Sequence, residues 1–221
     1  MTDACRPTSG LSRWIKDPYC GLSHAGGAVA SLIGVVVLLV LTRGGPMLYV
    51  GLVVYGISLV LLFTASALAH SLHVGERLGD RLDRFDHAAI FLLIAGTYTP
   101  VCLTALRGPW GYTMLSIEGA LAVIGVVTVL FTRVPLTWVS PLYVPMAWLV
   151  TIAFVPMVRS MTTATLLWLV VGGVIYSVGA VVYITKRPRL WPGRFGYHDL
   201  WHTMVLAGAA CHFVAVATLV L

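Results

Sequence analysis

Seven long apolar segments, separated only by short polar stretches, constrain the fold of this chain more than any other feature. A helix needs about 20 apolar residues to cross about 30 Å of hydrocarbon. Long apolar runs that end at charges or at Pro and Gly turns cover residues 24–42, 46–72, 84–106, 109–131, 137–158, 163–185 and 198–221. We therefore predict an all-α, polytopic membrane protein with seven transmembrane helices.

The composition agrees with this fold and excludes several others. Of the 221 residues, 59% are hydrophobic and only 10% are charged, whereas a soluble domain carries roughly a quarter charged residues because its whole surface faces water. A soluble enzyme, a secreted disulfide-linked domain and a disordered chain are thereby excluded. The net charge of +6 is better explained by membrane orientation and anionic lipid than by nucleic acid, so we expect no nucleic-acid partner.

The distribution of Lys and Arg predicts the orientation of the helices. Eleven basic residues fall on one side of the predicted spans, and three, Arg43, Arg107 and Arg159, fall on the other. We expect the protein in the cell (inner or plasma) membrane. The positive-inside rule then places its N-terminus in the cytoplasm and its C-terminus outside. Two regions follow: a cytoplasmic tail over residues 1–23, with a short interfacial helix around 12–19, and a seven-helix domain over 24–221.

The informative residues in such a chain are ionisable ones at membrane depth, because each is costly unless it is paired, hydrated or bound to metal. Three predicted helices bring such residues to the same cytoplasmic boundary. His70 lies near the end of the second helix, Asp86 and His87 open the third, and His198 and His202 open the seventh. We therefore predict a single layer of polar groups at the inner leaflet.

The spacing within this layer indicates a metal site. His198 and His202 are four residues apart, so both imidazoles project from one face of a helix, one turn apart. His70 would supply a third ligand from another helix. Three protein ligands with a position open to water is the pattern of catalytic zinc, whereas a structural site is closed by four. The alternative is that each histidine only hydrogen-bonds a neighbouring helix.

Two nearby residues have chemistry that suits the same site. Ser66 lies one turn before His70 on the same face and could hydrogen-bond a water or a substrate carbonyl, although a small packing residue is the alternative. Asp86 could act as a general base or cap the start of its helix.

Three further ionisable residues lie away from the predicted layer or at its edge. Glu118 is the carboxylate predicted deepest in the membrane. Such a carboxyl group either has a function or is protonated and hydrogen-bonded to a neighbour. His212 lies about 15 Å beyond His202 by helical rise, so it would line a cavity or bond a neighbouring helix. His24 is placed at the membrane interface.

Three motifs resemble the hemolysin III branch of the progestin and adipoQ receptor family, which includes the adiponectin receptors. The similarity covers about residues 18–221. It rests on SALAH at 66–70, FDHAAIFLLIAGTYTP at 85–100 and HDLWHTMVLAGAACHF at 198–213.

This resemblance implies a seven-helix protein with a cytoplasmic N-terminus and a zinc ion near the cytoplasmic side. The implied ligands are His70, His198 and His202, and the implied water-holding residues are Asp86 and Ser66. Because adiponectin receptors resemble zinc-dependent ceramidases, it also implies a hydrolase that acts on a membrane lipid amide or ester, with a role in lipid homeostasis. The alternatives are a hemolysin-type pore and a non-enzymatic lipid sensor with a structural zinc.

Overall fold

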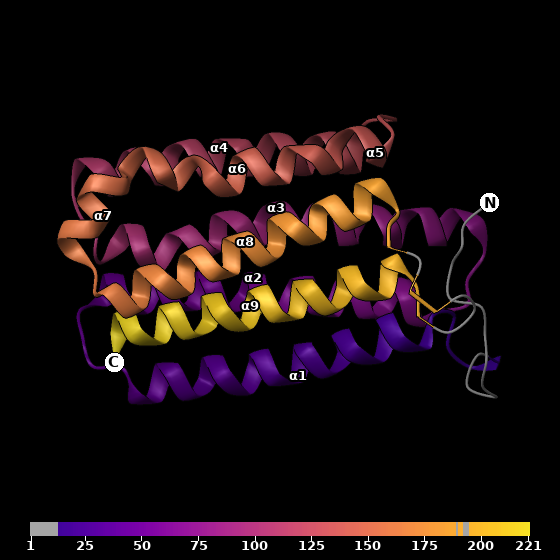
Figure 1. The fold of residues 1–221 in the computed structure, drawn as a ribbon, viewed down its shortest axis with the longest axis horizontal. Helices are drawn as coiled ribbons and strands as arrows, with labels where there is room; N and C mark the ends of the chain where they lie inside the picture. Colours follow the sequence, from indigo (N-terminus) through magenta and orange to yellow (C-terminus); the bar gives the residue numbers. More distant parts are fainter. Residues whose placement is uncertain (1–12, 189, 192–194) are drawn as a thin grey trace.

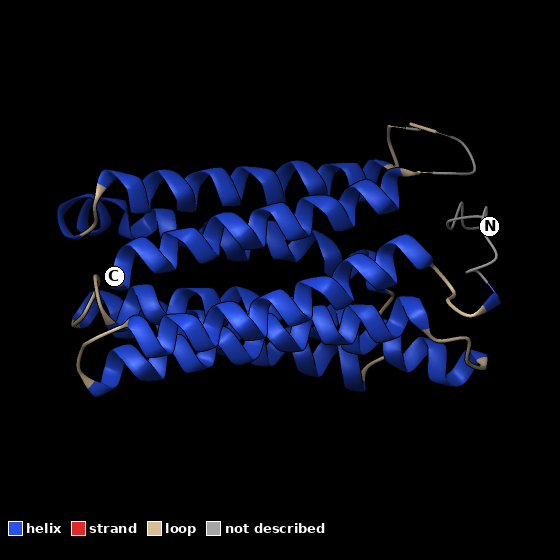
Figure 2. Ribbon diagram, turned by 90° about the horizontal axis from the view of Figure 1, so that it is seen from below, coloured by secondary structure: helices blue, strands red, loops and turns tan. Residues whose placement is uncertain are grey.

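A computed structural model describes residues 13–188, 190–191 and 195–221, which form a bundle of helices aligned along one axis (Figure 1). Seven segments are long and apolar enough to cross a membrane, which confirms the predicted all-α, seven-span architecture. The described residues contain no strand (Figure 2), and an isolated bridge joins Trp191 to Phe195. Of the basic residues counted above, Arg6, Arg189 and Arg194 lie outside the described part.

The seven spans follow one another with short connections. They are α1 (Pro18–Leu41), α2 (Pro46–Ser71), α3 (Glu76–Leu103), α4 (Pro109–Phe131), the segment Leu136–Ser160, α8 (Thr163–Thr185) and α9 (Tyr197–Val220). Pro18, Pro46 and Pro109 each stand in the first turn of their helix, where a backbone N–H would have no partner within the helix.

Two helices begin earlier than their apolar runs predict. Helix α1 starts at Pro18 rather than at residue 24, and α3 starts at Glu76 rather than at residue 84. Polar residues interrupt the apolar pattern in these first turns, although the backbone is already helical. In α1 the earlier start buries Cys20 and His24, whose exposed fractions are 0% and 2%. The side chain of His24, which we expected at the membrane interface, therefore lies inside the bundle.

The fifth span is a series of short helical pieces rather than one helix. These are α5 (Leu136–Val139), η2 (Ser140–Leu142), α6 (Tyr143–Trp148), η3 (Leu149–Ala153) and α7 (Phe154–Ser160). Pro141, Pro145 and Pro156 fall within it, and each lacks the N–H that continues an α-helix.

Helices that are adjacent in the sequence are also adjacent in space. Helices α1, α2, α3 and α4 pack in order, and α9 packs against both α8 and α1, which closes the bundle. Helix α3 also contacts α6 and α9. Because α2 ends where α1, α3 and α9 begin, four helices bring residues to the same end of the bundle, on the right in Figure 1.

Candidate metal centre

A cluster of four potential metal ligands lies at this end of the bundle. Cys20, His70, His198 and His202 each offer one ligand atom, and these atoms lie within 4.8 Å of one another. The ring centroids are 5.0 Å apart for His70 and His198, 4.6 Å for His70 and His202, and 4.7 Å for His198 and His202. The structure thus brings together the three histidines that the sequence singled out.

The kinds of donor in this cluster determine which ion it suits. Imidazole nitrogens and a thiol sulfur are ligands for zinc and other transition metals, whereas magnesium and calcium prefer oxygen. His202 is 3% exposed and Cys20 is fully buried, so water has little access from that side. The donors present therefore fit a zinc ion.

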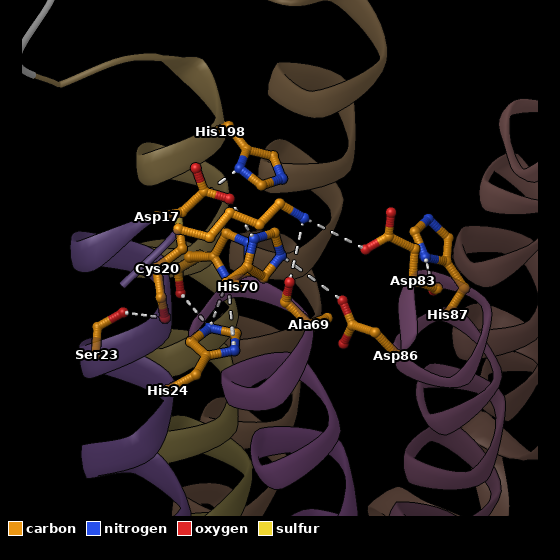
Figure 3. A network of polar contacts seen from close by, with 12 residues as sticks. Asp17, Cys20, Ser23, His24, Ala69, His70, Asp83, Asp86, His87 and His198 are labelled. Atoms are coloured by element: carbon orange, nitrogen blue, oxygen red, sulfur yellow. Dashed lines mark hydrogen bonds and ion pairs between the residues drawn. The ribbon is translucent and has the colours of Figure 1, made fainter. Parts of the chain in front are cut away.

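Asp86 and Ser66 lie at the edge of the cluster. Asp86 Oδ2 is 3.9 Å from His70 Nε2, and the Ser66 hydroxyl interacts with the same carboxylate. In Figure 3 Asp86 points from α3 toward His70. His87 does not join the cluster, because its Nδ1 lies 2.8 Å from the Asp83 carbonyl oxygen of its own helix.

A second set of residues at the cluster comes from the start of α1, and the sequence reading missed it. Asp17 Oδ2 is 3.1 Å from His70 Nδ1, Cys20 Sγ is 3.7 Å from His198 Nδ1, and His24 Nε2 is 2.9 Å from His202 Nδ1. Positions 17, 20 and 24 share one face of a helix. That spacing is the sequence signal that would have found them.

Asp17 lies just before α1 and is tied to the end of α2. The backbone N–H groups of Lys16 and Asp17 donate to the carbonyl oxygens of Ser71 and His70, at 3.2 Å and 2.8 Å. Within the described part of the expected interfacial helix, residues 14–17 are not helical, and Pro18 and Tyr19 belong to α1. Burial alone would raise the pKa of Asp17, but the hydrogen bond with His70 and the charges of His70 and Lys16 hold that pKa below its usual value. Asp17 is therefore an acceptor for His70.

A mainly apolar cavity extends from the cluster into the bundle. Its walls come from α1, α2, α3, α6, α8 and α9. The polar residues in its lining include Ser66, Asp86, His202, Thr97, Tyr98 and His212. His212 meets both expectations, because it lines this cavity and its Nε2 also lies 3.1 Å from the Leu169 carbonyl oxygen of α8. The cavity connects the candidate metal centre with the middle of the bundle.

Glu118 of α4 is not part of this lining. Its side chain is fully buried, and neither carboxyl oxygen has a hydrogen-bond partner among the described residues. The Tyr98 hydroxyl and the Cys102 thiol lie close enough to interact with it electrostatically. Glu118 is thus separate from the histidine cluster.

Comparison with known proteins adds information that the geometry does not contain. A protein-family model described as "Haemolysin-III related" matches residues 12–213. Hemolysin-3 of Bacillus cereus is 34% identical over 215 residues, which cover 96% of this chain and 95% of that protein. The Hemolysin-3 homolog of Bacillus subtilis is 35% identical over 198 residues, covering 88% and 90%. Heptahelical transmembrane protein 5 of Arabidopsis thaliana is 29% identical over 170 residues, covering 68% and 45%.

Proposed function

The chain belongs to the haemolysin-III-related family of multi-pass membrane proteins, and on that basis we propose that it is a zinc-dependent hydrolase of a membrane lipid amide or ester. His70, His198 and His202 would hold the ion. The observation that carries this proposal is the meeting of three imidazole rings within 5.0 Å of one another, beside Asp86 and at the wall of an apolar cavity.

The proposed chemistry assigns a different task to each residue near the cluster. A bound zinc ion would lower the pKa of a water molecule to about 7 and polarise the scissile carbonyl. Asp86 would accept a proton as the general base, since its carboxylate lies beside His70. Ser66 would orient that carboxylate through its hydroxyl.

The cavity supports a lipid as the substrate. Its walls are mainly apolar, and the polar groups at one end include Ser66, Asp86 and His202. Apolar walls suit an acyl chain because they remove its surface from water or headgroups. An amide or ester carbonyl at the end of that chain would then reach the cluster.

Metal content and lipid turnover test the proposal in sequence. Elemental analysis of the purified protein should find about one zinc per chain, and His202→Ala should lose it, because a ligand is removed. Fatty-acid release from ceramide and phospholipid vesicles should then fall by about 10²–10⁴-fold in Asp86→Asn, which keeps the shape but not the basicity. Val123→Ala on the lipid-facing side of α4 is the control, and equal release from Asp86→Asn and the control would overturn the mechanism.

A non-enzymatic lipid sensor with a structural zinc is the second candidate. The observation that favours it is the position of Cys20, whose sulfur would complete a closed set of four protein ligands. Removal of zinc by a chelator separates the two candidates. If the ion is structural, the protein should release no fatty acid even with zinc bound, and zinc removal should lower its thermal stability. If the ion is catalytic, zinc removal should mainly abolish fatty-acid release.

A further inference from the structure

We propose that the start of α1 positions all three histidines of the cluster. Asp17, Cys20 and His24 would each hold the Nδ1 atom of a different histidine and so leave its Nε2 atom for the metal. This inference rests on the proposed zinc site and assigns it an outer set of residues. The resulting pattern in the sequence is D-x-x-C-x-x-x-H.

The same ring atom is engaged in all three contacts, and this regularity carries the inference. Nδ1 lies 3.1 Å from Asp17 in His70, 3.7 Å from Cys20 in His198, and 2.9 Å from His24 in His202. A neutral imidazole that binds a metal through Nε2 must carry its proton on Nδ1. Metal-bound histidines almost always donate that N–H to a second residue, which fixes the ring.

The contact between Asp17 and His70 has the clearest donor and acceptor. The His70 N–H donates to the Asp17 carboxylate, and the opposite ring nitrogen, Nε2, is the one that faces Asp86 at 3.9 Å. Figure 3 shows Asp17 and Asp86 on different sides of His70. The two carboxylates therefore have different tasks, since Asp17 holds the ring and Asp86 lies toward the proposed reaction site.

The contact between Cys20 and His198 is one link in a longer chain. With its proton on Nδ1, His198 would donate to the Cys20 sulfur. The Cys20 thiol in turn donates to Asp199 Oδ1 at 3.3 Å. Asp199 Oδ2 accepts the backbone N–H of Gly196 at 2.8 Å. A thiol used in this way is a link to His198 and not a fourth metal ligand, and the acid between the two histidines of α9 supports it.

The contact between His24 and His202 lies deepest in the bundle. His24 Nε2 lies 2.9 Å from His202 Nδ1 and 3.4 Å from the His202 carbonyl oxygen. The inference requires the shorter contact to be the hydrogen bond: the proton of His202 on Nδ1 would be donated to His24 Nε2, and His24 would carry its own proton on Nδ1. The rings of His24 and Phe63 pack in a T-shaped arrangement, with centroids 5.1 Å apart. Glycine allows this close packing, because a Cβ atom at Gly27 would lie 2.8 Å from Leu206 and 3.0 Å from Phe63.

Zinc affinity, measured by competition with a chelating dye, tests the inference. Asp17→Ala, Cys20→Ala and His24→Ala should each weaken zinc binding by about 10–100-fold, as loss of an outer-sphere partner does. The variants Asp17→Asn, Cys20→Ser and His24→Gln keep an acceptor and should recover most of the affinity. Leu22→Ala, on an exposed side of the same helix, is the matched control and should bind zinc like the wild type.

Cobalt substitution tests the role of Cys20 by a signature that a folding defect does not produce. Wild-type protein loaded with Co²⁺ should lack a thiolate-to-cobalt charge-transfer band, because all the ligands are nitrogens or water. A band that is present in the wild type and lost in Cys20→Ser would make Cys20 a ligand and overturn its positioning role.

The possible failures are distinguishable. A wild type that binds no zinc would overturn the proposed function and this inference together. A wild type that binds zinc, with alanine variants that bind it as tightly as Leu22→Ala, would overturn only the inference. If an alanine variant does not fold, the zinc affinity of the corresponding conservative variant tests the inference at that position, and the cobalt spectrum tests it for Cys20.

Discussion

Gly111, near the start of α4, shows how one missing methyl group permits a tight turn. A Cβ atom at this position would overlap the carbonyl oxygen of Cys102 and lie 2.6 Å from that of Leu106. The Gly111 N–H donates to the same Leu106 oxygen at 2.9 Å. Backbone atoms cannot swing aside as a side chain can, so α4 must shift if a methyl group is added.

We therefore predict that Gly111→Ala lowers the free energy of unfolding by about 1–3 kcal/mol, the usual cost of overpacking. The matched control is Gly119→Ala in the same helix, where a Cβ atom meets nothing within 4 Å. Alanine should stabilise the helix there by up to about 1 kcal/mol. Thermal unfolding in detergent measures both, and a stabilising effect at both positions would contradict the prediction.

Individual site residues were predictable where helical spacing and helix direction determined their place. Two histidines on one turn of α9 and His70 at the end of α2 reach the same end of the bundle in any seven-span arrangement. Cys20 and His24 escaped detection because the polar start of α1 interrupts its apolar run, which placed the helix start six residues too late. The sequence correctly indicated that Glu118 is a buried carboxylate. Its position outside the cavity depends on how α4 packs against the other helices, which the local sequence around Glu118 does not reveal.

At the scale of elements, the fifth span depends on α3 for the hydrogen bonds that it cannot make internally. The Tyr98 hydroxyl donates to the carbonyl oxygens of Met146 and Ala147, at 3.1 Å and 2.9 Å, and accepts the N–H of Val150 at 2.7 Å. Water is scarce at this depth, so no other partner can replace the hydroxyl cheaply.

Tyr98→Phe should consequently lower the free energy of unfolding by about 1–3 kcal/mol, the cost of buried backbone groups without partners. Amide hydrogen exchange should also become faster around residue 150. Tyr112→Phe, an exposed position on α4, should change neither quantity. Equal stability of the two variants would show that the broken span satisfies its own backbone.

The sequence predicted that a fifth span exists, but not that it is divided into pieces. Its length and apolar composition suffice to cross a membrane, and each of its prolines lacks the N–H that continues an α-helix. Where α6 gives way to η3, the partner of the backbone is Tyr98, a residue of a different helix. A local pattern cannot reveal such a long-range partner.

At the scale of the whole molecule, an odd number of spans places the start of α1 and the end of α9 on opposite sides of the membrane. The cluster lies at the end of the bundle where the predicted excess of Lys and Arg is found, as at Lys16, Arg84 and Arg133. The opposite end carries Arg43, Arg107 and Arg159. The positive-inside rule predicts that the cluster faces the cytoplasm.

Fusions to alkaline phosphatase, which is active only outside the cytoplasm of a bacterial host, test this orientation. A fusion after Leu221 should be active, and a fusion in the 72–75 connection should be inactive. A fusion in the 42–45 connection serves as the internal control and should be active. The reversed pattern of activities would place the cluster on the other side.

The cluster draws on the first helix and the last, with His198 and His202 contributed by α9. The chain must therefore be synthesised at least as far as His202 before the proposed ion could be captured. A nascent protein halted after α8 would already have six helices in the bilayer and yet contain only one of the three histidines. Under the proposed function, a chain that stops before α9 could neither hold the ion nor attack the lipids around it.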